Sequence, residues 1–111
     1  MAKDQHLTRQ LAETQEQHAK AQENDRTTIV YRLYTENAAN LSDLVARYFP
    51  AATLYDGLGL WQGKEEQSCV IEIVGHRSDL QQVVFLADAI KHTNKQQSVL
   101  LTHHRVDTLM V

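Results

Sequence analysis

The stretch WQGKEEQSCVIEIVG, residues 61–75, places a polar turn directly before a strongly apolar run. Residues 62–67 are polar and include a glycine, which is typical of a turn, and residues 68–75 have the composition of a β-strand. Successive strand residues point to opposite faces, and here both faces are apolar except for Glu72. The stretch therefore predicts a hairpin whose second strand needs cover on both sides.

Two further strands precede and one follows this hairpin strand. β-branched and aromatic residues over 27–36 predict a first strand, and residues 51–61 predict a second. The second strand contains Gly57 and Gly59, which indicate a bulge or a close backbone approach. Residues 97–106 form the last predicted strand, and 107–111 are a candidate for a short fifth.

Two helices are expected between these strands. The first begins after Asn40, which can cap it, and ends before Pro50. The second begins with a capping-box pattern, Ser78 followed by Gln81, and ends in basic residues around Lys91. The resulting order, β-α-β-β-α-β, predicts an α+β ferredoxin-like fold in which one antiparallel sheet carries both helices on one face.

The chain divides into an arm and a domain. Residues 1–26 are rich in glutamine and charge, and have only Leu7 and Leu11 as large apolar side chains. This composition predicts a polar helical or flexible N-terminal arm, too thinly apolar to hold a core. The ferredoxin-like domain is predicted over residues 27–111.

Charge and composition exclude several function classes. The 111 residues carry a net charge of −3, so there is no global attraction to duplex nucleic acid or to an anionic membrane. No apolar segment is long enough to span a membrane, and the first ten residues have no apolar core of a secretory signal. The single cysteine, Cys69, is expected to be a buried hydrophobic side chain, and the cytoplasm is the predicted location.

The second face of the predicted sheet is the main clue to assembly. A face this apolar would be a large exposed patch in a monomer, so we expect a partner subunit to cover it and a homo-oligomer, a trimer or a dimer, to result. Arg32 and Glu72 are expected to pair within this layer. The alternative is that the N-terminal arm folds over the face. The predicted interface residues are Val30, Arg32, Tyr34, Val70, Glu72 and Val74.

The predicted hairpin also carries a family resemblance. Trp61, Gly63, Lys64 and Glu66 form a W-x-G-K turn that resembles the second hairpin of the divalent-cation-tolerance (CutA) family, trimeric relatives of the PII signalling proteins. The resemblance implies a ferredoxin-like fold and an oligomer. The family's C-terminal His-Pro-Tyr element is missing, since no proline follows Pro50. The same element order resembles dimeric α/β-barrel proteins, which pair two such sheets face to face.

The motifs for chemistry are few. The six histidines have no metal-ligand spacing, and no nucleophile or phosphate-loop motif is present, so no catalytic residue, metal or cofactor is predicted. Aromatic rings in the hairpin can stack on a planar ligand, and nearby charged groups can hold a small anion. The candidate ligand-binding residues are Tyr55, Trp61, Lys64, Glu66, His76 and Arg77.

Three functions remain open from the sequence. The first is a small oligomeric binding or regulatory module that holds a small anionic or nucleotide ligand, or a protein partner, at subunit edges. The second is a dimeric α/β-barrel enzyme with a pocket between sheet and helices, in which Glu72, Tyr31 or His104 would be the acid or base. The third is a mobile-element protein that sequesters a signalling nucleotide or inhibits a host protein.

Overall fold

The secondary structure follows the predicted order β-α-β-β-α-β. The structure is a computed structural model that describes residues 25–111, so the predicted N-terminal arm lies outside the described residues except for its last two. The elements are β1 (Thr28–Glu36), α2 (Leu41–Ala46), β2 (Thr53–Trp61), β3 (Lys64–His76), the 3-10 turn η1 (Arg77–Asp79), α3 (Leu80–Thr93) and β4 (Leu100–Arg105).

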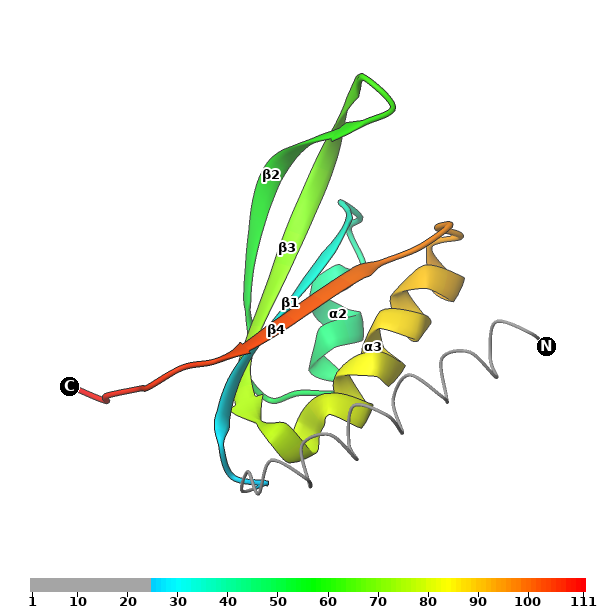
Figure 1. Ribbon diagram of the computed structural model, residues 1–111. Helices are drawn as coiled ribbons and strands as arrows, with labels where there is room; N and C mark the ends of the chain where they lie inside the picture. The colour runs from blue at the N-terminus through cyan, green and yellow to red at the C-terminus, as the bar shows by residue number, and fades with distance from the viewer. Residues whose placement is uncertain (1–24) are drawn as a thin grey trace.

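The strands form one antiparallel sheet in the order β2-β3-β1-β4. Both helices lie on the same side of the sheet, and the β2–β3 hairpin projects beyond them (Figure 1). This is the ferredoxin-like arrangement, and it confirms the fold predicted from the sequence. The two central strands, β1 and β3, therefore have neighbours on both edges.

The core lies between the sheet and the helices. Alternate residues of β1 and β3 point toward the helices, as the period of two in a strand requires, and α3 packs its apolar stripe against them. Leu33 and Ile71 lie opposite each other and have no exposed surface. The fully or nearly fully buried apolar side chains are Ile29, Tyr31, Leu33, Leu41, Leu44, Val45, Cys69, Ile71, Ile73, Leu80, Val83, Leu86 and Ile90.

The hairpin turn is shorter than the sequence indicated. Only Gln62 and Gly63 separate the strands, and their φ angles are 52° and 78°. Two successive positive φ angles are the signature of a type I′ turn, whose twist suits a two-residue hairpin. Pairing therefore begins at once with Trp61 opposite Lys64, and β3 starts four residues before the predicted Ser68.

The predicted bulge in β2 is absent from the described strand. Pairing with β3 runs without interruption from Thr53 opposite Glu72 to Trp61 opposite Lys64. Gly57 and Gly59 sit in regular register opposite Ser68 and Glu66, without positive φ. What the two glycines provide is space above the sheet.

The helix and strand ends also differ from prediction. The predicted cap at Ser78 is wrong, because the chain turns two residues earlier, where the His76 backbone N–H donates to Asp79 Oδ2 at 2.8 Å. The last strand, β4, begins at Leu100, after a loop in which Lys95 has a positive φ. Within the described part of the chain, residues 107–111 form no fifth strand.

The core predicts a specific loss of stability. We expect Leu33→Ala to lower the free energy of unfolding by about 2–5 kcal/mol, because it leaves a cavity between two packed layers. Leu58→Ala is the matched control, since Leu58 is 65% exposed and its truncation should cost less than about 1 kcal/mol. Urea denaturation followed by circular dichroism measures both, and equal losses would contradict the assigned core.

The turn makes a second prediction. Gly63→Ala should destabilise the protein by about 1 kcal/mol, because an L-residue at φ +78° is strained. Gly59→Ala should cost nothing measurable, since its new Cβ would make only ordinary contacts, at 3.5 Å and beyond. The same denaturation experiment compares them, and a larger loss for Gly59→Ala would exclude this turn geometry.

Candidate functional site

The sheet has a second face that no helix within residues 25–111 covers. Three opposed pairs cross its centre: Val30 with Val74, Arg32 with Glu72 and Tyr34 with Val70. These six are the residues predicted for the interface, and the register places all of them together on this face. Val74 is 55% exposed and Val30 is buried. We call this surface the open face.

Arg32 and Glu72, at the centre of the open face, form an ion pair with each other. Arg32 Nε donates to Glu72 Oε2 at 2.9 Å, as expected from the sequence. The hydrogen bond to Glu72 raises the pKa of the Arg32 guanidinium. Because each charge has its partner beside it, the surrounding valines and tyrosines form a face with no net charge at its centre.

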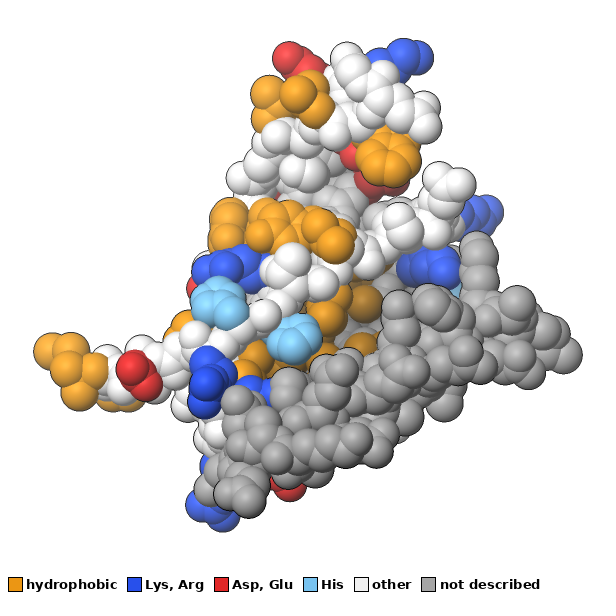
Figure 2. Space-filling view, viewed as in Figure 1, with side chains coloured by type: hydrophobic (Ala, Val, Ile, Leu, Met, Phe, Trp, Pro, Cys, Tyr) orange, Lys and Arg blue, Asp and Glu red, His pale blue; other side chains and the backbone are white. Residues whose placement is uncertain are grey.

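A groove of about 500 Å³ lies at one end of the open face. Its walls come from the β2–β3 hairpin, the end of β1 and the loop that leads into β4. On β2 the face positions between Tyr55 and Trp61 are held by Gly57 and Gly59, and Ser68 faces them from β3. The groove exists because these three residues carry little or no side chain. Hydrophobic side chains are exposed along this hairpin in Figure 2.

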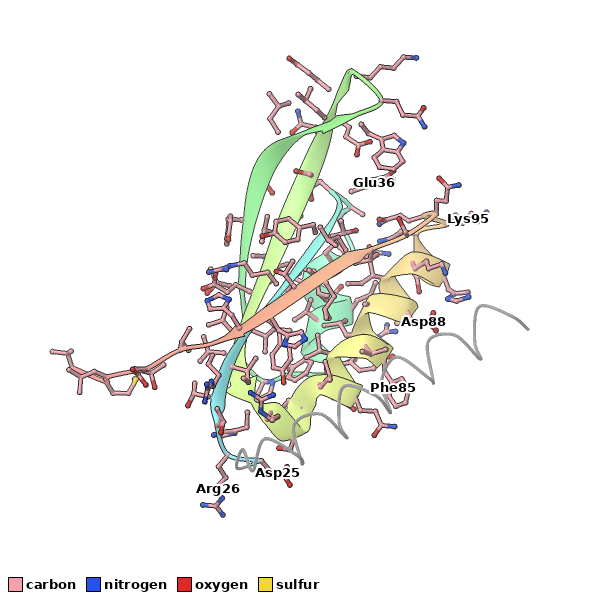
Figure 3. All side chains as sticks on the ribbon, in the orientation of Figure 1. Asp25, Arg26, Glu36, Phe85, Asp88 and Lys95 are labelled. Atoms are coloured by element: carbon pink, nitrogen blue, oxygen red, sulfur yellow. The ribbon has the colours of Figure 1, made fainter. Side chains whose placement is uncertain are left out.

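The groove lining is aromatic, polar and acidic. Tyr34 and Trp61 contribute rings, and Glu36 and Glu66 contribute carboxylates. Glu36 lies at the end of β1, between the hairpin and the loop that carries Lys95 (Figure 3). The lining contains no lysine or arginine among the described residues.

One wall of the groove is held by a buried glutamine that sequence reasoning missed. The Gln96 side chain accepts a hydrogen bond from the Thr35 hydroxyl at 2.8 Å and donates one back at 2.6 Å. Its Oε1 also accepts from the Glu36 backbone N–H at 3.3 Å. These bonds tie the loop before β4 to the end of β1. A lone glutamine in a polar loop has no pattern that could have identified this role.

The structure brings together only part of the predicted ligand-binding set. Trp61 and Glu66 line the groove; Tyr55 follows on the same face of β2, and Lys64 lies opposite Trp61 at the turn. His76 and Arg77 lie at the other end of β3. A strand of 13 residues separates Lys64 from His76 by roughly 40 Å. The six residues therefore do not surround one site.

The acid or base candidates of the enzyme hypothesis do not converge. Glu72 pairs with Arg32, and His104 lies opposite Val30 on the open face. Tyr31 is in the core, where its hydroxyl donates to the His76 carbonyl at 2.7 Å and burial raises its pKa. Within residues 25–111 there is also no group of three side chains suited to hold a metal ion.

Two other sequence expectations concern the cysteine and the membrane. Cys69 is a free thiol with 2% of its surface exposed, and burial raises its pKa. Among the described helices, none has the length and apolarity needed to cross a membrane. The cytoplasmic location stays a prediction.

Comparison with known proteins supports the fold. No family model and no curated protein matches the sequence. The chain is similar to the crystal structure of a DUF3240 family protein from Shewanella baltica OS155, with a TM-score of 0.58, 13% identity, and coverage of 77% of this chain and 96% of that one. At this identity the likeness shows the fold alone. The resemblance to CutA and PII proteins stays a prediction.

A second similar structure is the de novo designed protein Foldit4. It has a TM-score of 0.41 and 13% identity, and the match covers 70% of this chain and 94% of the design. A likeness this low supports no inference about the present chain.

The buried thiol can be tested directly. We expect Cys69 in the folded protein to react with a disulfide reagent such as DTNB roughly a hundredfold more slowly than in urea, because both burial and a raised pKa suppress the thiolate. In urea, Cys69 should form a mixed disulfide with the reagent and release one equivalent of the reagent's aromatic thiolate per chain. Equal rates in the two states would mean that the cysteine strand is not packed against the helices.

Proposed function

We propose that this protein is a self-associating binding module whose copies meet through the open face and which holds a small ligand in the groove. The observation that supports the proposal most directly is the open face itself. Its central residues are apolar or internally neutralised, and no helix within the described chain covers them.

Self-association is favoured because a monomer would leave the apolar side chains of the open face in contact with water. Tyr34, Tyr55, Val74 and Leu100 all belong to this face and are exposed in the single chain. Burying such a surface against a second copy removes apolar area from water, and a closed symmetric oligomer does so for every subunit. The Arg32–Glu72 pair would enter the interface already neutralised, which lowers the cost of desolvating either charge alone.

The groove supports the binding part of the proposal. Its volume falls in the range of small-molecule sites, and its lining combines rings with a few polar groups. Because it lies at one end of the open face, beside the projecting hairpin, a ligand there would sit near the edge of the proposed interface. A module of this kind binds and regulates; it needs no catalytic group.

A small anion such as a nucleotide is the occupant expected from the sequence, and one observation favours it. Trp61 offers a ring for stacking, and Lys64 lies opposite it at the turn. The two carboxylates in the lining oppose that choice. The other ligand expected from the sequence is a protein partner that binds at the same edge of the subunit.

Self-association is tested by placing a charge on the open face. We expect Val74→Glu to weaken association by at least about tenfold, because an unpaired carboxylate would be buried beside Val30. Light scattering during gel filtration at micromolar concentration measures the subunit number, and circular dichroism checks folding.

The matched control for this experiment is Phe85→Glu. Phe85 is 49% exposed, similar to Val74, and lies on α3 rather than on the sheet; Figure 3 shows it on the helical side. We expect this variant to associate like the parent. Dissociation by Phe85→Glu alone, or a parent protein that is monomeric, would contradict the proposed interface.

A further inference from the structure

We propose that the groove binds a small organic cation of the quaternary-ammonium type. The inference rests on the proposed function in one respect, since it takes the groove as the ligand site. It departs from the sequence expectation in the sign of the ligand's charge.

The first observation is that the ring of Trp61 is accessible, because its neighbours on the same face of β2 carry no side chains. Trp61 is 57% exposed, and the two next positions on the same face of β2 are Gly59 and Gly57, so no side chain of its own strand covers it. Tyr34 lines the same groove from β1. The faces of tryptophan and tyrosine rings carry negative electrostatic potential and attract cations. Quaternary ammonium groups suit such rings in water because their diffuse charge is weakly hydrated and little hydration is lost on binding.

The second observation is the charge of the lining. Glu36 lies opposite Ser68, and Glu66 lies two residues from Ser68 on the same face, which makes the two residues diagonal neighbours with Cα atoms about 7 Å apart. Neither carboxylate has an ion-pair partner within the described chain. No lysine or arginine of residues 25–111 lines the groove. Two carboxylates on this surface repel an anion and attract a cation.

The third observation is size and polarity. A groove of about 500 Å³ can hold a small molecule, and the glycines keep its floor flat. Val70 and Leu100, both opposite Tyr34 on the open face, add apolar surface to the lining, which suits the methyl groups of a quaternary ammonium better than a strongly hydrated metal ion. The rings, the carboxylates and the apolar side chains of the lining together favour a small organic cation.

Trp61 makes the proposal directly measurable, because it is the only tryptophan in the chain and lies in the groove. We would titrate the full-length protein with choline and follow tryptophan fluorescence, using sodium chloride to match ionic strength. The neutral probe 3,3-dimethylbutan-1-ol has the same shape without the charge, and ATP supplies the opposite charge. We expect saturable binding of choline, at least about fivefold weaker binding of the alcohol, and no competition by ATP.

Three variants locate the site. Glu66→Gln should weaken choline binding about fivefold, the loss expected for one partly solvated charge contact. Glu65→Gln is the matched control, because Glu65 lies opposite Leu60 on the other face of the hairpin and outside the lining. Gly59→Leu should abolish binding by filling the groove without strained backbone, since Gly59 does not have a positive φ.

Each outcome decides the matter. Equal affinity for choline and the neutral alcohol would leave an apolar groove and overturn the assignment of charge. Saturable binding of ATP, with no binding of choline, would contradict the proposal of a cationic ligand but would retain the groove as a ligand site. A flat response to all three probes would overturn the cation and the ligand groove together. Subunit number measured in the same samples shows independently whether the self-association half of the proposed function holds.

Discussion

The pairing of β1 with β3 is the constraint on which the rest of the molecule depends. Nine consecutive residues of β1 oppose nine of β3, and both strands carry apolar side chains on both faces. The side chains on one face of these two strands are buried beneath α2 and α3, and the apolar stripe of α3 packs against them. Because the period of a strand is two, satisfying one face leaves the alternate residues on the other. The open face is thus a direct consequence of the same register that builds the core.

The Arg32–Glu72 ion pair limits what the open face can do. A single arginine or glutamate at the centre of two paired strands would make burial of this surface costly, since a lone charge loses its hydration without compensation. As a pair at 2.9 Å they neutralise each other before any partner arrives. Such a pair adds little stability at a half-exposed position. Its importance for the proposed assembly is that it leaves no unpaired charge at the centre of the open face.

The groove has a different origin, because it arises from missing side chains. The β2–β3 hairpin extends past the helices (Figure 1). Its open-face positions between Tyr55 and Trp61 are Gly57 and Gly59, and Ser68 lies opposite Gly57. The opposite wall of the groove is held in place by Gln96, in the loop before β4, whose side chain forms two hydrogen bonds with the Thr35 hydroxyl of β1. The ring of Trp61 and the carboxylates of Glu36 and Glu66 then set the chemistry of the proposed site. Lys64 lies opposite Trp61 on the same face, beyond the groove lining.

The sequence by itself determined the fold class, the two-faced strands and the Arg32–Glu72 pair. These follow from local periodicity and from residues that neighbouring strands must bring together. It missed the two-residue turn at Gln62 and Gly63, since the backbone angles of that turn are not encoded in composition alone. Only the tertiary structure decided that His76 and Arg77 lie far from Trp61, because a strand of 13 residues carries its ends apart. The groove was likewise beyond sequence reasoning: its walls come from residues 60 or more positions apart, such as Glu36 and Gln96, and only folding places them together.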